Sequence, residues 1–156
     1  MKLHMNTLGI DIGSTTVKIA ILDESHQILF ADYERHFANI QETLASLLSK
    51  AIDKLGEMTV HPVITGSGGL ALANHLEVPF VQEVIAVSSS LQELAPKTDV
   101  AIELGGEDAK ILFLTGGTEV RMNGSCAGGT GAFIDQMATL LAITPDELNT
   151  LSHGSE

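Results

Sequence analysis

The stretch LGIDIGSTTVK spans Leu8–Lys18. An apolar run carries Asp11 toward its end, and a glycine, Gly13, precedes three hydroxyl side chains: Ser14, Thr15 and Thr16. A strand that turns here sets backbone N–H groups and hydroxyls around one small concavity, which suits phosphate oxygens. Asp11 is then placed to hold a divalent cation, through water in the case of magnesium, which dehydrates reluctantly. The alternative is a β-hairpin whose turn happens to read Gly-Ser-Thr.

The composition of the chain limits the classes of protein to which it can belong. A chain of 156 residues, 44% of them hydrophobic, is long enough for one ordinary domain or two small ones. Eight basic against 20 acidic residues give a net charge of -12, which repels nucleic acids and anionic membrane surfaces. Tryptophan is absent and aromatic residues make up 4%, so a stacking platform for single-stranded nucleic acid is not expected. We therefore expect neither nucleic acid nor membrane as a partner.

Three features favour a cytoplasmic setting. The N-terminal residues reach Asp11 before a sustained apolar run accumulates, so no signal peptide is expected. No run of about 18 apolar residues occurs, so no transmembrane helix is expected. The single cysteine, Cys126, excludes an internal disulfide framework and fits a reducing cytoplasm.

The residues around the opening stretch predict a sheet followed by helices. Apolar and β-branched runs predict strands over residues 7–12, 17–22, 27–36 and 58–65. Apolar side chains at helical spacing predict helices over residues 39–55, ended by Gly56, and 82–94. Pro62 is disfavoured in a central strand, so its strand is expected at an edge or a bulge.

A glycine-rich segment follows the strand over residues 58–65. Gly66, Gly68 and Ala71 match the spacing of the dinucleotide-binding fingerprint. The helix predicted over residues 70–75 is too short for a βαβ unit, and Pro79 follows before an acidic ribose-binding strand can form. We therefore reject a Rossmann fold and interpret the segment as a strand-to-helix turn that borders a cleft.

The pattern of the first quarter of the chain starts again at Asp99. Strands are predicted over residues 100–104, 109–114 and 119–122, and the first of them is followed by Gly105 and Gly106. Helices follow over residues 132–141 and from Pro145. This pseudo-repeat predicts two similar lobes, residues 1–98 and 99–156, that face one cleft. The second lobe lacks the elements that would complete a copy of the first.

Two lobes of βββαβα order, each with a phosphate-contacting hairpin, resemble the actin, Hsp70 and sugar-kinase superfamily of ATPases. GIDIGSTTVK resembles its first phosphate motif, and IELGGEDAK resembles its second. The resemblance implies an α/β protein with the actin-like ATPase (ribonuclease H-like) fold. We expect one complete βββαβα lobe and the first part of a second.

The segment RMNGSCAGGTGAFIDQMA narrows this resemblance. It is similar to the signature of the activators of 2-hydroxyacyl-CoA dehydratases and the related benzoyl-CoA reductase ATPase subunits, the BadF/BadG/BcrA/BcrD type. The likeness runs from Leu8 to about Leu141. ELGGEDAK and NGSCAGGTGAFIDQMA also resemble the N-terminal segment of the long CoA-substrate-specific enzyme activases, which implies that these residues are a fragment of a longer protein.

The resemblance implies roles for the first phosphate motif. Asp11 would position magnesium, and the turn that follows would hold the β- and γ-phosphates of ATP or ADP through four residues: Gly13, Ser14, Thr15 and Thr16. Lys18 would either reach a phosphate as a point charge or point outward from the second strand. We favour solvent for this side chain.

The resemblance also implies roles for the residues of the second phosphate motif. Gly105 and Gly106 would let the backbone approach the γ-phosphate, since no Cβ intervenes. Glu103 or Glu107 would orient the attacking water, and Asp108 would assist with the metal. Many members of the superfamily carry aspartate where Glu103 stands. The alternative for each acid is that it only caps a turn.

In the family, a cysteine of the third motif and a second one further along bind a [4Fe–4S] cluster shared between two subunits. Cys126 would supply one ligand per chain, with Gly128 and Gly129 among the cofactor-binding residues. Two copies of this chain would bring two thiolates where four are expected. The alternative is that Cys126 is a small buried hydrophobic residue, although the glycines around it favour an open loop.

The function implied is an ATP-binding and ATP-hydrolysing activator module. It would couple hydrolysis to low-potential electron transfer from the cluster to a CoA-thioester dehydratase or a benzoyl-CoA reductase-type partner, as a homodimer when full length. Phosphoryl transfer needs positioning and charge neutralisation more than covalent help, so two glycine turns and carboxylate-held magnesium suffice. Two alternatives remain: an amino-sugar kinase of the same superfamily, and a nucleotide-binding regulatory module without turnover.

Overall fold

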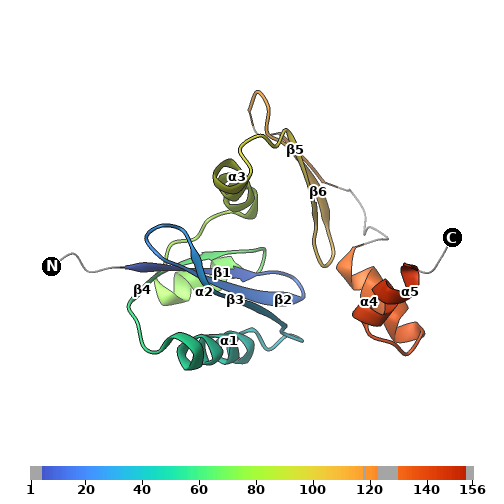
Figure 1. Ribbon diagram of the computed structural model, residues 1–156, viewed down its shortest axis with the longest axis horizontal. Helices are drawn as coiled ribbons and strands as arrows, with labels where there is room; N and C mark the ends of the chain where they lie inside the picture. Colours follow the sequence, from blue (N-terminus) through green and yellow to red (C-terminus); the bar gives the residue numbers. More distant parts are fainter. Residues whose placement is uncertain (1–4, 118, 123–129, 154–156) are drawn as a thin grey trace. The chain divides into compact units, whose positions relative to one another are not determined.

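The computed structural model describes residues 5–117, 119–122 and 130–153. The chain divides into two compact units, Met1–Pro96 and Lys97–Glu156. Figure 1 shows the first unit in blue to green and the second in yellow to red. Each unit has a sheet of its own.

The sheet of the first unit positions the opening stretch. Its strands are β1 (Asn6–Ile12), β2 (Thr16–Leu22), β3 (Ile28–Arg35) and β4 (Val60–Thr65), in the order β3-β2-β1-β4. β2 pairs antiparallel with both β1 and β3, and β4 pairs parallel with β1. β4 lies at the edge of this sheet, as Pro62 predicts. Because β1 and β4 run in the same direction, their C-terminal residues Asp11 and Thr65 lie side by side.

Helix α1 (Ile40–Leu55) covers one face of this sheet (Figure 1). Its buried side chains Leu44, Leu47 and Ala51 belong to one core with the inward-facing residues of the strands. Leu47 is completely buried, and burying a leucine fully stabilises the fold by about 1.5 to 3 kcal/mol. The periodicity of the sequence thus identified both the helix and the face that it buries.

Two more helices complete the first unit, α2 (Gly69–Leu76) and α3 (Glu83–Leu94). α2 has only 8 residues, which agrees with the short helix that excluded a Rossmann fold. Between the helices the chain returns along β4. Ile64 donates its N–H to the carbonyl of Pro79 at 2.9 Å and accepts one from Val81 at 2.9 Å.

A charged cluster joins β3 to α1. The Lys50 ammonium lies 3.1 Å from Asp32 Oδ2 and 2.7 Å from Glu34 Oε1. The hydrogen bond from Lys50 lowers the pKa of Asp32 from 3.8 and that of Glu34 from 4.5. In return, the bond to Glu34 and then that to Asp32 raise the pKa of Lys50 above 10.5.

Replacing Lys50 by methionine is expected to reduce the loss in the free energy of unfolding that occurs when the pH is lowered from 7 to 3. Carboxyls with a lowered folded-state pKa stabilise the fold above their ordinary pKa, and this contribution disappears as the pH falls through the folded value. The raised pKa of Lys50 keeps its own contribution until the pH rises past its ordinary value of 10.5. Urea unfolding at pH 7 and pH 3 tests this: the wild type should lose more stability between the two than Lys50→Met. Equal losses would contradict it.

The second unit carries a three-stranded antiparallel sheet. β5 (Val100–Leu104), β6 (Ala109–Phe113) and β7 (Glu119–Met122) pair in chain order, and α4 (Gly131–Leu140) and α5 (Pro145–Ser152) follow. Thr144 and Glu147 form a capping box at the start of α5: Glu147 donates its N–H to Thr144 Oγ1 at 3.2 Å, and its carboxylate accepts the Thr144 N–H at 2.7 Å. The bond from the Thr144 N–H, and then one from the Thr144 hydroxyl to the same carboxylate at 3.0 Å, lower the pKa of Glu147.

Most predicted element boundaries differ from the observed ones by one or two residues. The strand predicted from Met58 begins at Val60. Val60 pairs with Asn6, the first residue of β1, so no β1 residue is available to pair with Met58. Cys126, Gly128 and Gly129 lie outside the described residues. Within the described part of the chain, no helix is long and apolar enough to cross a membrane.

Candidate phosphate-binding site

The first predicted phosphate motif forms the turn between β1 and β2. The N–H of Gly13 donates to the carbonyl of Thr16 at 2.9 Å and closes the turn. Ser14 is exposed, and Thr15 and Thr16 are half-buried. The motif is therefore a β-hairpin, so the hairpin and the phosphate-binding interpretations describe the same segment. Its hydroxyls lie where a ligand can reach them.

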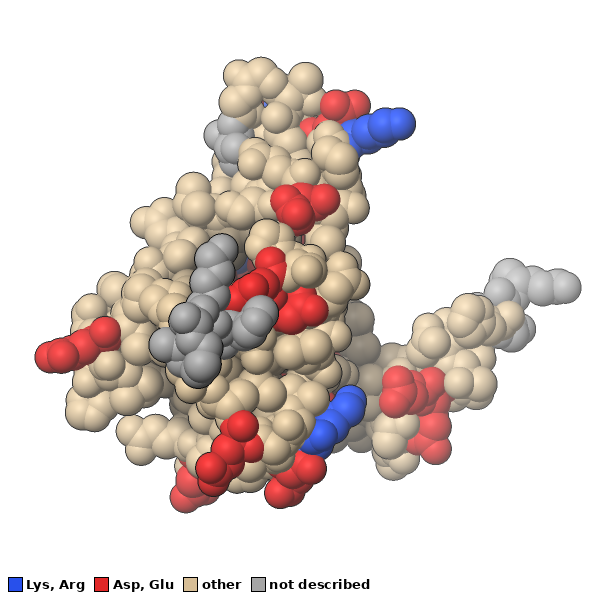
Figure 2. All heavy atoms as spheres, turned by 60° about the vertical axis from the view of Figure 1, so that its left-hand side comes forward, with Lys and Arg blue, Asp and Glu red and all other residues tan. Residues whose placement is uncertain are grey.

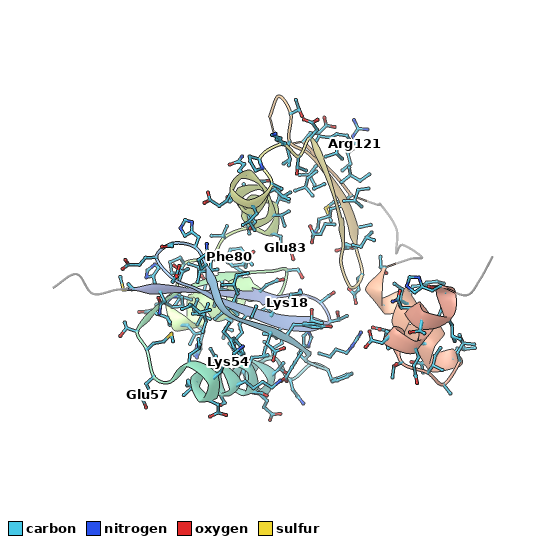
Figure 3. The ribbon with its side chains drawn as sticks, viewed as in Figure 1. Lys18, Lys54, Glu57, Phe80, Glu83 and Arg121 are labelled. Atoms are coloured by element: carbon cyan, nitrogen blue, oxygen red, sulfur yellow. The ribbon has the colours of Figure 1, made fainter. Side chains whose placement is uncertain are left out.

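Asp11 lies next to this turn and contacts Lys18 on β2. The Lys18 ammonium lies 2.8 Å from Asp11 Oδ2, and the two side chains are 49% and 34% exposed. Figure 3 shows Lys18 on the first sheet. Our preference for a solvated Lys18 was incomplete, because the side chain is half exposed yet paired with Asp11. An ion pair so open to solvent contributes little stability, and both groups remain accessible to a ligand.

Asp11 and Lys18 line a hollow of about 530 Å³ on the face of the sheet opposite α1. Thr65 of β4 lines it from the neighbouring strand, and Ser89 and Ser90 line it from α3. The hydroxyl oxygen of Thr65 is buried and has no hydrogen-bond partner among the described residues. Buried polar atoms are normally paired. The hollow therefore combines a carboxylate, an ammonium and hydroxyls in the first unit alone.

The glycine-rich segment after β4 packs against Asp11 and Ile12 at the end of β1. Gly66 has a positive φ of 96°, and a Cβ there would overlap the Ile12 carbonyl and come within 2.6 Å of Asp11 Oδ1. Gly68 donates its N–H to the Ile12 carbonyl at 2.9 Å. Ser67 donates its N–H to Glu83, at the start of α3 (Figure 3), at 3.0 Å. This turn thus contacts the last residues of β1, directly before the phosphate motif.

The second predicted motif repeats the hydrogen bonding of the first. Gly105 donates its N–H to the carbonyl of Asp108 at 2.8 Å, as Gly13 does to Thr16. Glu103 and Lys110 face each other across β5 and β6, as Asp11 and Lys18 do across β1 and β2. The pseudo-repeat read from the sequence is therefore also a repeat of structure.

The acid–lysine pair of the second unit is more buried than that of the first. The Lys110 side chain is 9% exposed, and its ammonium lies 3.4 Å from Glu103 Oε1. Glu103 Oε2 is buried without a hydrogen-bond partner in the part of the chain that the structure describes. Glu107 and Asp108 are exposed at the turn. Of the predicted acids, Glu103 thus has an oxygen that still needs a donor such as water.

The start of α4 is fixed to the second turn. Gly131 donates its N–H to the Gly105 carbonyl at 3.0 Å, and Ala132 donates to the Gly106 carbonyl at 2.8 Å. Thr130, just before the helix, is buried. The first residues of α4 are therefore anchored beside the second glycine turn.

The residues present fit magnesium but not an iron–sulfur cluster. Among the described residues, no group of three or more His, Cys, Asp or Glu side chains could hold a metal ion. Magnesium usually needs only one or two carboxylates, with phosphate and water completing its shell, so Asp11 suffices. A [4Fe–4S] cluster is held by four cysteine thiolates, and this chain contains only Cys126. The chain by itself cannot complete such a site.

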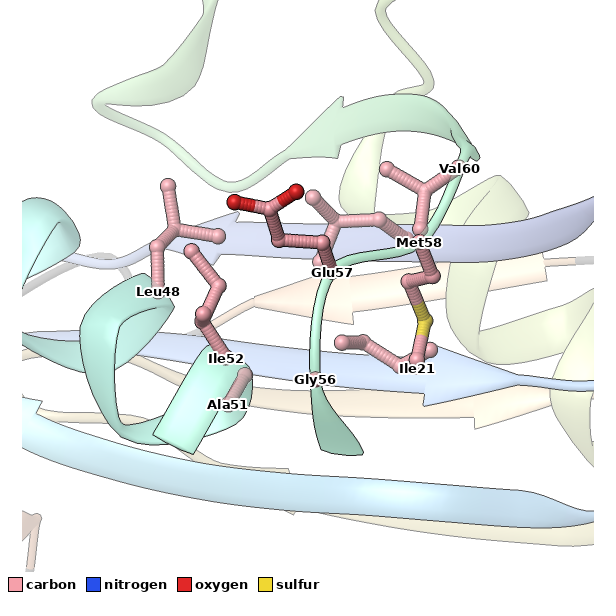
Figure 4. Close-up of a pocket in the computed structure, with 9 residues that line it drawn as sticks. Ile21, Leu48, Ala51, Ile52, Gly56, Glu57, Met58 and Val60 are labelled. Atoms are coloured by element: carbon pink, nitrogen blue, oxygen red, sulfur yellow. The ribbon is translucent and has the colours of Figure 1, made fainter. Parts of the chain in front are cut away.

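A second hollow, of about 440 Å³, lies beside the end of α1 (Figure 4). It is lined by apolar side chains such as Ile21, Leu48 and Ile52, and Glu57 is the one charged residue in its lining. It offers no cation to a phosphate. Figure 2 shows one face of the molecule, on which acidic side chains outnumber basic ones, in line with the net charge of -12. The hollow at Asp11 is thus the better candidate.

Sequence reasoning missed part of this site. It did not single out Thr65, which reaches the site only through the parallel pairing of β4 with β1. Nor did it single out Ser89 and Ser90, which α3 contributes from residues distant in sequence. The one available signal was that Thr65, like Asp11, is a polar residue at the end of an apolar strand.

Comparison with known proteins identifies relatives along almost the whole chain. The model of the BadF/BadG/BcrA/BcrD ATPase family matches residues 8–156. The 2-hydroxyisocaproyl-CoA dehydratase activator of Clostridioides difficile is 30% identical over 167 residues, which cover 97% of this chain and 58% of the relative. The activator of lactoyl-CoA dehydratase of Anaerotignum propionicum is 31% identical, over 94% of this chain and 58% of the relative.

A solved structure is also similar. It is the activator of the 2-hydroxyisocaproyl-CoA dehydratase from Clostridium difficile with bound ADPNP, with a TM-score of 0.84 and 29% identity. The match covers 97% of this chain and 58% of that one. This similarity confirms the predicted α/β fold of the actin-like ATPases. The chain spans less than two thirds of the length of these relatives.

Proposed function

We propose, from the premise that this chain belongs to the BadF/BadG/BcrA/BcrD ATPase family, that it binds ATP with magnesium at its two glycine turns and hydrolyses it. The observation that carries the proposal is the repeated turn, in which Gly13 and Gly105 make the same hydrogen bond beside an acid–lysine pair. The similar structure with bound ADPNP supports a nucleotide as the ligand.

The chemistry assigns a task to each group. The amides and hydroxyls of Ser14, Thr15 and Thr16 bind phosphate oxygens, and Lys18 adds a positive charge beside them. Asp11 would hold magnesium, which when bound neutralises charge on the phosphates. Gly105 and Gly106 let the backbone approach the terminal phosphate, since no Cβ intervenes. Glu103 orients the attacking water through its unpartnered oxygen, and Asp108, which is exposed at the second turn, would assist with the metal.

Replacing Glu103 by glutamine is expected to slow hydrolysis by about 100-fold, because an amide cannot accept a proton from water. Binding of ADPNP should change by less than about threefold, since the amide oxygen of glutamine still accepts the Lys110 hydrogen bond. Glu107→Gln should lower the rate far less, because Glu107 is exposed. Phosphate release and equilibrium titration measure the two effects. A rate in Glu103→Gln equal to that of the wild type would remove Glu103 from the mechanism.

For the whole protein we propose that hydrolysis drives low-potential electron transfer to a CoA-thioester dehydratase or reductase component. The names of the relatives, activators of 2-hydroxyisocaproyl-CoA and lactoyl-CoA dehydratases, support this class of partner. A homodimer with a shared [4Fe–4S] cluster would take Cys126 as one ligand per chain. The other thiolates would have to come from outside this chain.

Product analysis separates this function from its two rivals. A hydrolase releases one inorganic phosphate per ATP consumed, with no added acceptor. An amino-sugar kinase would consume ATP only when a sugar is present and would transfer the phosphate to it. A regulatory module would bind ADPNP and release no phosphate above background. Stoichiometric phosphate release supports the proposal, and either of the other patterns contradicts it.

A further inference from the structure

His36 lies directly after β3 and its ring contacts the first phosphate turn. It is only 9% exposed. The N–H of Ala38 donates to His36 Nδ1 at 3.0 Å, and His36 Nε2 lies 3.2 Å from the carbonyl oxygen of Gly13. Each ring nitrogen therefore faces a backbone group whose hydrogen-bonding role is fixed: the Ala38 N–H can only donate, and the Gly13 carbonyl can only accept.

These two contacts assign the tautomer of the ring. A backbone N–H can only donate, so Nδ1 accepts from Ala38. A carbonyl oxygen can only accept, so Nε2 carries the hydrogen that bonds to it. In this Nε2–H tautomer, His36 donates a hydrogen bond to the Gly13 carbonyl.

The local backbone is arranged around this ring. Phe37 and Ala38 have positive φ angles of 43° and 70°, a conformation that L-residues with a Cβ adopt only at a cost. These angles return the Ala38 N–H to the ring of His36. The main chain of His36 also donates its N–H to the Thr15 carbonyl at 3.1 Å. His36 therefore contacts the turn through both its backbone and its side chain.

We propose that His36 is a positioning residue for nucleotide binding, an inference that rests on the proposed function of the Gly13–Thr16 turn. Its Nε2–H fixes the Gly13 carbonyl, so this oxygen cannot rotate toward phosphate oxygens without losing a buried hydrogen bond. The turn N–H groups are thereby held ready for the anion before it arrives. Such preorganisation raises affinity because less order must be imposed on binding.

Three substitutions separate the Gly13 contact from general packing. Gln places an amide N–H where Nε2 stands, so His36→Gln keeps the donor to Gly13. Asn places an oxygen where Nδ1 stands, so His36→Asn keeps the Ala38 contact and loses the Gly13 one. His36→Ala loses both. The readouts are hydrogen exchange of the Gly13 and His36 amides in the nucleotide-free protein, thermal stability, and the dissociation constant for ADPNP with magnesium.

His36→Asn and His36→Ala are expected to speed exchange of the Gly13 amide and to weaken ADPNP binding by about 5- to 10-fold, the value of one hydrogen bond. His36→Gln should stay within about threefold of the wild type in both. Ala38→Gly keeps the N–H and suits a positive φ, so it should retain wild-type exchange with equal or higher stability.

Exchange in the free protein tests whether His36 holds the turn. Equal ADPNP affinities of His36→Asn and His36→Gln would overturn its role in nucleotide binding. If His36→Asn and His36→Gln show the same Gly13 exchange and the same thermal stability, His36 does not hold the turn and the proposal is overturned. If exchange separates them as expected but the wild type binds no ADPNP, the contact stands, its role in nucleotide binding falls, and the proposed function fails independently.

Discussion

Replacing Asp11 by asparagine is expected to lower the rate of ATP hydrolysis by about 100-fold or more, the usual effect of removing a group that neutralises or orients charge at the reacting centre. The amide keeps the size of the side chain but loses the charge that would hold magnesium. The change should reduce stability by no more than about 1 kcal/mol, because the Asp11–Lys18 pair is open to solvent. Phosphate release across a magnesium titration measures the effect.

Two controls locate the cause of that loss. Lys18→Met breaks the same ion pair and keeps the carboxylate, so hydrolysis should fall by about tenfold, the lower end of the value of a hydrogen bond to a charged group, because Lys18 is half exposed. Asp53→Asn changes an exposed acid on α1 and should leave the rate unchanged. A rate in Asp11→Asn close to that of the wild type, or a loss in Lys18→Met just as large, would show that Asp11 has no role of its own with the metal.

Replacing Gly66 by alanine is expected to destabilise the protein by about 2 to 6 kcal/mol. The positive φ of Gly66 costs about 1 to 3 kcal/mol for a residue with a Cβ. The overlap of the new methyl group with the Ile12 carbonyl adds about 1 to 3 kcal/mol of overpacking. Because the methyl group also presses on Asp11 Oδ1, nucleotide binding should weaken as well. Urea unfolding and an ADPNP titration measure the two losses.

Gly56 provides the matched control. It also has a positive φ, 78°, but a Cβ there meets nothing within 4 Å. Gly56→Ala therefore carries the backbone strain alone and should cost about 1 to 3 kcal/mol, with unchanged affinity for ADPNP. Equal losses of stability in the two variants would mean that Gly66 is required for its conformation and not for the space that it leaves beside Asp11.

Local patterns in the sequence predicted the elements of this fold well. The spacing of Leu44, Leu47 and Ala51 predicted both α1 and its buried face, because a helix repeats every 3.6 residues and this stripe has no competing period. Pro62 predicted an edge strand, because proline cannot donate to a central ladder. The two glycine turns were predicted from strands that end in an acid followed by glycine.

Contacts between distant segments could not be predicted in the same way. The neighbourhood of Asp11 and Thr65 requires the parallel pairing of β1 with β4, across the whole of β2, β3 and α1. The bond from His36 to Gly13 depends on two residues in a conformation that their side chains disfavour. His36 is also buried. Neither the periodicity of apolar residues nor the composition of turns predicts such contacts.

The most direct measurement is a titration of the isotopically labelled protein with ADPNP and Mn²⁺, a paramagnetic substitute for Mg²⁺, followed in its amide spectrum. Bound manganese broadens the signals of nearby amides. The account predicts saturable broadening of the amides of Gly13–Thr16 and of Gly105–Asp108 at one common midpoint. Binding that broadens only one of the two turns, or the absence of saturable binding up to millimolar nucleotide, would contradict it.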